Sequence, residues 1–177
     1  MRDIPEEDLV FIDETGFWVG MSRRYARSLK GRRAYHFRRF YKGRKVTLIG
    51  AIDINGMVAS KQIEGSMKGK DFYQFVKDDL VPQLRKGHVV VMDNLRAHKI
   101  KGIEELIKSK GARIEYLPPH SPDYNPIEML WSSLKAFICR QPSHSLEMLN
   151  LLIALALWWM EISFFRHWFV KGCYCAK

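Results

Sequence analysis

The sequence has few cysteines and no hydrophobic run long enough to cross a bilayer. Its three cysteines, Cys139, Cys173 and Cys175, are odd in number and lack the paired spacing of a zinc site. We therefore expect a reducing compartment and no disulfide framework. The longest apolar stretch, Leu149–Met160, is interrupted by Asn150 and falls short of the about 20 residues that a membrane helix needs. It predicts a buried helix, part of which could instead form a subunit contact.

Acidic residues are also scarce relative to basic ones. The 177 residues include 29 Lys and Arg against 19 Asp and Glu, so the net charge is +10. This excess favours a polyanionic partner, with nucleic acid ahead of an anionic membrane surface. An ordinary basic surface on a soluble protein is the alternative. The acidic start, Met1–Asp8, lacks the basic-then-apolar pattern of a secretory leader. We expect a cytoplasmic, nucleoid-associated protein with no membrane partner.

The apolar runs and turn residues predict one α/β domain covering residues 1–177. The Asn55-Gly56 pair indicates a hairpin, and the later strand–helix–strand order implies parallel pairing. These patterns favour a mixed sheet flanked by helices. Strands are expected at Asp8–Asp13, Lys45–Ile54, Met57–Ile63, His88–Met92 and Ala112–Leu117, and helices at Gly69–Leu84, Ala97–Lys110, about Pro126–Phe137 and Ser145–Ser163.

Three carboxylates occupy special places in this pattern. Asp13 and Asp93 each close an apolar run, and Glu128 follows a proline-rich loop at the start of a predicted helix. Taken alone, each has an ordinary interpretation as a turn, a cap or a first-turn helix residue. Two strand-end acids and one helical acid can also converge on a pair of divalent cations, which clamp the attacking and leaving oxygens of a phosphodiester.

Three segments around these acids resemble the catalytic region of DDE transposases. They are FIDETG at residues 11–16, VMDNLRAHK at 91–99 and LPPHSPDYNPIE at 117–128. The spacing is similar to that of the bacterial insertion-sequence branch of the mariner superfamily, because 34 residues, 94 to 127, separate the second and third acids. The resemblance extends over essentially the whole chain.

The resemblance implies a ribonuclease H-like fold with a mixed five-stranded sheet. It implies that Asp13, Asp93 and Glu128 are the catalytic residues and hold two Mg²⁺ or Mn²⁺ ions. It also implies two reactions: hydrolysis of a strand at the transposon end, then attack of the freed 3′ hydroxyl on target DNA. Relatives carry an N-terminal helix-turn-helix region that reads the transposon ends. We expect this chain to lack that region.

A basic and aromatic stretch at residues 23–45 predicts a DNA track, since Arg and Lys contact phosphates and aromatic rings stack on bases. A solvated hairpin is the alternative interpretation. The residues expected to contact DNA are Arg23, Arg24, Arg32, Arg33, Arg38, Arg39, Lys42, Arg44, His98, Lys99 and Lys135. Asn94 and Asn125 are interpreted as turn and cap residues beside the site. Trp131 is expected to fix the helix of Glu128 against the core.

The leading hypothesis is therefore a DDE transposase catalytic domain that acts on double-stranded DNA. We expect a homodimer in the active complex, because joining two ends needs more than one subunit, and an upstream end-binding domain as a partner. A ribonuclease H-like nuclease or resolvase would use similar acids without this proline motif. A non-catalytic DNA-binding remnant is the third hypothesis.

Overall fold

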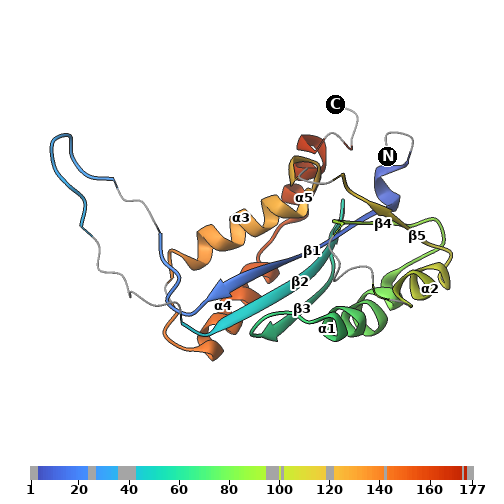
Figure 1. The fold of residues 1–177 in the computed structure, drawn as a ribbon. Helices are drawn as coiled ribbons and strands as arrows, with labels where there is room; N and C mark the ends of the chain where they lie inside the picture. The colour runs from blue at the N-terminus through green and yellow to red at the C-terminus, as the bar shows by residue number, and fades with distance from the viewer. Residues whose placement is uncertain are drawn as a thin grey trace.

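The computed structural model describes residues 4–23, 27–35, 43–94, 100, 102–118, 122–141, 143–172 and 174. Its centre is a five-stranded mixed sheet in the order β3-β2-β1-β4-β5, as Figure 1 shows. The strands are β1 (Leu9–Trp18), β2 (Lys45–Asp53), β3 (Gly56–Glu64), β4 (Val89–Met92) and β5 (Arg113–Tyr116). The first three strands are antiparallel neighbours, whereas β4 pairs in parallel with both β1 and β5. The predicted mixed α/β sheet is confirmed.

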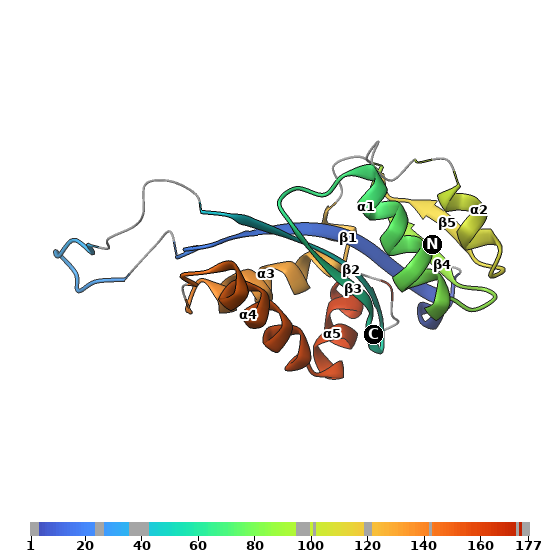
Figure 2. The ribbon, with the colours of Figure 1, turned by 90° about the horizontal axis from the view of Figure 1, so that it is seen from below.

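Helices cover both faces of this sheet (Figure 2). One face carries α1 (Gly69–Gln74), which continues through the π-helical turn η2 (Phe75–Leu80) and the 3₁₀ turn η3 (Val81–Gln83), together with α2 (Ile103–Lys108). The other face carries α3 (Ile127–Ile138), α4 (Leu146–Trp158) and α5 (Ile162–Lys171). Two short 3₁₀ turns, η1 (Glu6–Asp8) and η5 (Pro122–Tyr124), precede β1 and α3.

Side chains alternate along β1 and so divide the core in two. Leu9, Phe11 and Phe17 are buried on the side of α3, α4 and α5. Val10 and Ile12 are buried on the side of α1, η2 and α2. Because successive strand residues point to opposite faces, Asp13 lies on the same face as Phe11.

The predicted end of the first strand at Asp13 is wrong. β1 continues to Trp18 because β2 pairs with it over its length, from Phe11 opposite Ile52 to Trp18 opposite Lys45. Its burial also continues, since Thr15 and Phe17 are both buried. Asp13 therefore lies within a strand rather than after one, and the flanking strand backbone fixes its position.

The hairpin predicted at Asn55-Gly56 is confirmed. The Asn55 amide donates to Asp53 Oδ1 over 2.7 Å, and Gly56 begins β3 with φ of 143°. That conformation favours glycine, which has no Cβ to clash.

The helix predicted over Ser145–Ser163 is two helices. The Ser145 hydroxyl accepts from the Met148 amide over 3.1 Å and caps α4 as expected. However, α4 ends at Trp158, and α5 runs at 80° to it. After the bend, Phe169 lies against the sheet, and the centre of its ring is 5.4 Å from the centre of the Phe11 ring.

The apolar helix predicted to be buried is buried on one face only, through Leu149, Ile153 and Ala156, and its other face is exposed. Leu151, Leu155, Trp158 and Trp159 are 60%, 45%, 84% and 73% exposed. Among the described residues no single helix is long and apolar enough to cross a membrane. Only the bent pair α4 and α5, taken together, meets that test, by length and composition alone.

Of the three other predicted helices, two fit the structure closely. The helix expected at Gly69–Leu84 spans α1, η2 and η3, and the helix after the proline loop is α3. The predicted start of the helix at Ala97 lies outside the described residues, and α2 begins at Ile103 after Gly102.

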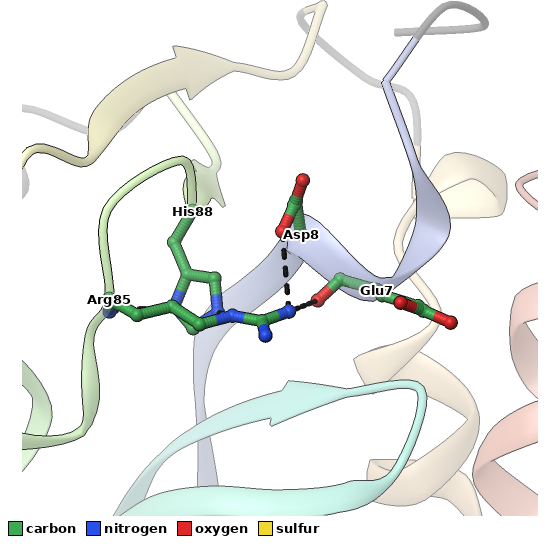
Figure 3. Close-up of polar contacts among 4 residues, drawn as sticks. All are labelled: Glu7, Asp8, Arg85 and His88. Atoms are coloured by element: carbon green, nitrogen blue, oxygen red, sulfur yellow. Dashed lines mark hydrogen bonds and ion pairs between the residues drawn. The ribbon is translucent and has the colours of Figure 1, made fainter.

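A polar cluster ties the start of β1 to the start of β4 (Figure 3). The Arg85 guanidinium donates to the Glu7 carbonyl over 3.0 Å and to Asp8 Oδ1 over 3.3 Å. Its Nε donates to His88 Nε2 over 2.6 Å. Burial and the adjacent guanidinium both lower the pKa of His88, because each disfavours an imidazolium. The cluster stabilises the alignment of the two strands that lead to the acids.

Candidate active site

Two of the three predicted acids follow equivalent points on adjacent strands. In the parallel pair of β1 and β4, Leu9 lies opposite Val89 and Phe11 opposite Val91. Asp13 and Asp93 each follow two residues later along their chains. Since neighbouring strands lie about 4.8 Å apart, the two carboxylates start from adjacent backbone positions.

Asp13 is a buried carboxylate with two hydrogen-bond donors. It is 8% exposed. Its Oδ1 accepts from the backbone amide of Glu14 over 2.8 Å, and its Oδ2 accepts from Trp131 Nε1 over 3.1 Å. Because each donor holds a different oxygen, the plane of the carboxylate is fixed.

The pKa of Asp13 is raised to about 7, far above the usual range for aspartate. Burial is the largest cause, since it disfavours the charged form, and the charges of Glu14 and Glu128 add to it. The two hydrogen bonds lower the pKa but do not offset these effects. A carboxylate in this position gains from a cation placed beside it.

Helix α3 brings the third acid to the same side of the sheet. Glu128 lies in the first turn of α3 and is exposed, and its charge acts on Asp13. Trp131 is three residues further on, so the two side chains share a face of the helix. Because the Trp131 indole reaches Asp13, this face of α3 looks onto the middle of β1.

The two asparagines beside the acids lie in different environments. Asn94 is exposed directly after Asp93. Asn125 is 5% exposed, and its backbone carbonyl accepts from the Glu128 amide over 3.1 Å. The side-chain cap predicted for Asn125 is not formed, because Pro126 takes the cap position and Asn125 Oδ1 is buried without a hydrogen-bond partner.

The carboxylates suit a hard divalent cation that takes some of its oxygen ligands from the protein and the rest from a substrate. Within the described part of the chain, no three His, Cys, Asp or Glu side chains are grouped so as to hold a metal ion by themselves. Mg²⁺ keeps several waters and takes further oxygens from phosphates, so one or two carboxylates suffice for each ion. The charged groups that raise the pKa of Asp13 are both carboxylates, and a bound cation would offset their repulsion.

The link between Trp131 and Asp13 was missed by reasoning from the sequence, which assigned this tryptophan only a packing role. It is 1% exposed, and its ring lies against Gly50 in β2, directly opposite Asp13. The available signal was the three-residue spacing from Glu128, which places Trp131 on the face of α3 that carries the acid.

Of the predicted DNA contacts that the structure describes, four lie on the chain between β1 and β2 and one lies on α3. We call the described parts of this connection, residues 19–23, 27–35 and 43–44, the arm; its residues 27–35 lie away from the sheet in Figures 1 and 2. Arg23, Arg32 and Arg33 are exposed on it, and the Arg33 guanidinium lies 5.9 Å from the centre of the Tyr35 ring.

The remaining predicted DNA contacts divide into two groups. Arg44 is exposed and pairs with Glu64 at 3.2 Å, and Lys135 is half-buried in the last turn of α3. The other predicted contacts lie outside the described residues: Arg24, Arg38, Arg39, Lys42, His98 and Lys99. DNA binding by all of these side chains stays a prediction.

Solved transposase structures share this fold. The chain superposes on a pre-cleavage Mos1 transpososome with a TM-score of 0.81 at 16% identity, covering 94% of this chain and 53% of the Mos1 chain. A Mos1 mariner paired-end complex with Mn matches with a TM-score of 0.78 at 18% identity, covering 94% and 53%. The isolated Mos1 catalytic domain, with Raltegravir and Mn, matches with a TM-score of 0.72 at 13% identity, covering 94% and 78%.

The chain thus spans about half the length of the Mos1 chains in those DNA complexes. The ribonuclease H-like fold predicted from the resemblance is confirmed by these matches. A search of curated proteins gave no match. The sequence model of the family described as DDE superfamily endonuclease matches residues 8–150, a range that includes all three acids. The protein therefore belongs to the DDE superfamily of endonucleases.

Proposed function

We propose that this protein is a transposase catalytic domain that cuts DNA at transposon ends and transfers the 3′ hydroxyl into target DNA. The observation that carries the proposal is the buried Asp13 within β1. It lies two residues after Phe11, just as Asp93 lies two residues after the paired Val91, and the charge of Glu128 acts on it. The family match, which includes all three positions, supports it.

Asp13, Asp93 and Glu128 would hold two Mg²⁺ or Mn²⁺ ions. When bound, such ions lower the pKa of an attacking water and neutralise charge on the phosphate. Two of the Mos1 paired-end complexes were solved with Mn and with Mg. Asp13 would contribute to both ions, and Asp93 and Glu128 would each complete one of them.

Each acid has a separate task in this proposal. Asp13 is oriented by the Glu14 amide and the Trp131 indole, and it must release its proton to act as a ligand. Asp93 is set beside it by the alignment of β4 with β1. Glu128 comes from α3, which lies on the same side of the sheet as Asp13 and whose start is stiffened by Pro126.

The basic arm supports double-stranded DNA as the partner. Arg23, Arg32 and Arg33 are exposed there, and phosphate contacts supply most of the affinity in non-specific DNA binding. We also propose a homodimer in the active complex, an end-binding domain as a further partner, and action at the nucleoid. Sedimentation of the protein with and without transposon-end DNA would test the dimer.

The first test is Mn²⁺-dependent nicking of supercoiled plasmid. Wild-type protein should nick the plasmid, Asp93→Ala should not, and the control Glu105→Gln should behave as wild type, because Glu105 is an exposed carboxylate on α2. Equal nicking by wild type and Asp93→Ala would overturn the assignment of the site.

The second test separates a transposase from a ribonuclease H-like nuclease or resolvase. Wild-type protein receives a pre-cleaved transposon end and a target plasmid. Joined products that depend on Glu128 support transposition, and nicking without joining supports a nuclease. Binding of DNA without either reaction would favour a remnant, provided that an added end-binding domain does not restore activity.

A further inference from the structure

The side chain of Trp131 is placed differently from an ordinary core tryptophan. It is 1% exposed and lies three residues after Glu128 on α3, yet its polar atom reaches across to the sheet. Its Nε1 donates to Asp13 Oδ2 over 3.1 Å. A buried indole N–H needs an acceptor, and here that acceptor is the carboxylate of the candidate active site.

Gly50 provides the space that this contact requires. It lies in β2 opposite Asp13. A Cβ at this position would lie 2.8 Å from Trp131 Cη2 and 3.5 Å from Cζ2. Since the indole is rigid, any larger residue at Gly50 would push the ring and its N–H away from Asp13.

We propose that Trp131, seated against Gly50, is a positioning residue that holds the Asp13 carboxylate in the orientation needed for cation binding. The inference rests on the proposed function. The Glu14 amide holds Oδ1 and the indole holds Oδ2, so rotation of the carboxylate is restricted from both sides. Each carboxylate oxygen has two acceptor positions, so both keep capacity for a cation. Hydrogen-bond partners of this kind typically change metal affinity about 10- to 100-fold when removed.

The test compares Mn²⁺ affinity, measured from the electron paramagnetic resonance signal of free Mn²⁺, across four variants. Trp131→Phe keeps the ring but removes the donor, and it should weaken Mn²⁺ binding about 10- to 100-fold. Gly50→Ala should also weaken binding, although the donor remains. In the double variant Gly50→Ala/Trp131→Phe, the alanine should cause little loss of Mn²⁺ affinity beyond that of Trp131→Phe alone. The smaller phenyl ring leaves room for the alanine Cβ. Trp168→Phe, which alters a buried indole packed against Phe165 in α5, should leave the affinity unchanged.

A readout on the metal-free protein separates positioning from packing. In wild type, one indole N–H resonance should move as Asp13 titrates, and Trp131→Phe should remove that resonance. In Gly50→Ala the resonance should persist but lose its pH dependence. A purely structural role predicts an unchanged titration in Gly50→Ala and a loss of affinity that only follows the loss of folded protein, which urea unfolding monitors.

The outcomes distinguish the positioning role of Trp131 from the proposed function. Equal Mn²⁺ affinity in wild type and folded Trp131→Phe overturns the positioning role while leaving the proposed function intact. No Mn²⁺ binding by wild type overturns the proposed function, and the positioning role with it. If Gly50→Ala fails to fold, Trp131→Phe alone decides between these outcomes.

Discussion

Replacing Asp13 with asparagine should stabilise the metal-free protein at high pH. The pKa of Asp13 is raised to about 7, whereas an unfolded aspartate has an ordinary value of 3.8. Between these values the folded protein holds a proton that the unfolded chain has lost. The free energy of unfolding therefore falls as pH rises from about 4 to about 7, because folding with Asp13 charged becomes steadily less favourable. Asparagine at this position has no charge to bury.

The size of this effect follows from the shift. Each unit of pKa corresponds to 1.36 kcal/mol, so raising the pH from 5 to 8 should cost wild type about 2.5 kcal/mol at this site. Because Asp13 is only 8% exposed, screening by water reduces this cost little. Asparagine has one acceptor oxygen, so it keeps only one of the two hydrogen bonds, at a cost of about 1 kcal/mol that does not depend on pH.

The assay is urea unfolding in EDTA at pH 5 and pH 8 for wild type, Asp13→Asn and the exposed-acid control Glu105→Gln. The difference in unfolding free energy between Asp13→Asn and wild type should grow by about 2.5 kcal/mol from pH 5 to pH 8. Saturating Mn²⁺ at pH 8 should reverse the order, since the cation stabilises only a protein that carries the carboxylate. A difference that is the same at both pH values, or that shrinks at pH 8, would refute the burial argument.

Three further predictions concern Asp93, DNA binding by the basic residues, and the polar cluster of Arg85 and His88. Asp93→Asn should abolish plasmid nicking but leave non-specific DNA affinity equal or higher in a gel-shift titration, because a negative charge near the phosphates is removed. The logarithm of DNA affinity should fall with the logarithm of salt concentration at a slope steeper than about −2, the value for roughly two phosphate contacts, and a shallower slope would contradict a basic DNA track. The pKa of His88 is lowered, so the unfolded chain takes up a proton near pH 6.5 that the folded protein resists. The unfolding free energy of wild type minus that of His88→Gln should therefore fall as pH drops through this range, because the contribution of Asp13 is the same in both proteins and cancels. Equal slopes for the two proteins would contradict the arrangement of Arg85 and His88.

Much of the fold follows from the sequence because the strands here are strongly marked. The run Val89–Met92 is apolar at every position, as expected for a strand buried on both faces, and Asn55-Gly56 marks the only turn that joins β2 to β3 directly. The positions of the three acids could be predicted for the same reason. Asp13 and Glu128 lie within β1 and α3, and Asp93 directly follows β4, and the sequence marks all three of these elements clearly.

The errors arise where tertiary contacts override local pattern. The end of β1 depends on its antiparallel partner β2, which pairs as far as Trp18 and cannot be inferred from the residues of β1 alone. The break between α4 and α5 accompanies the packing of Phe169 against Phe11, and no proline or glycine marks it in the sequence. The contact of Trp131 with Asp13 joins positions 118 residues apart and emerges only from the folded chain.

The parallel alignment of β1 and β4 also bears on how such a protein can change in length. Deleting one residue of β1 before Asp13 would turn the carboxylate to the opposite face of the sheet, because side chains alternate along a strand. Deleting two would restore the face but move the acid about 6.6 Å along the sheet, away from Asp93. By contrast, residues added in the exposed turn at 109–111, between α2 and β5, would leave the pairing of β1 with β4 unchanged. Length variation that preserves activity should therefore collect between Asp93 and Glu128, and the strand before Asp13 should tolerate none.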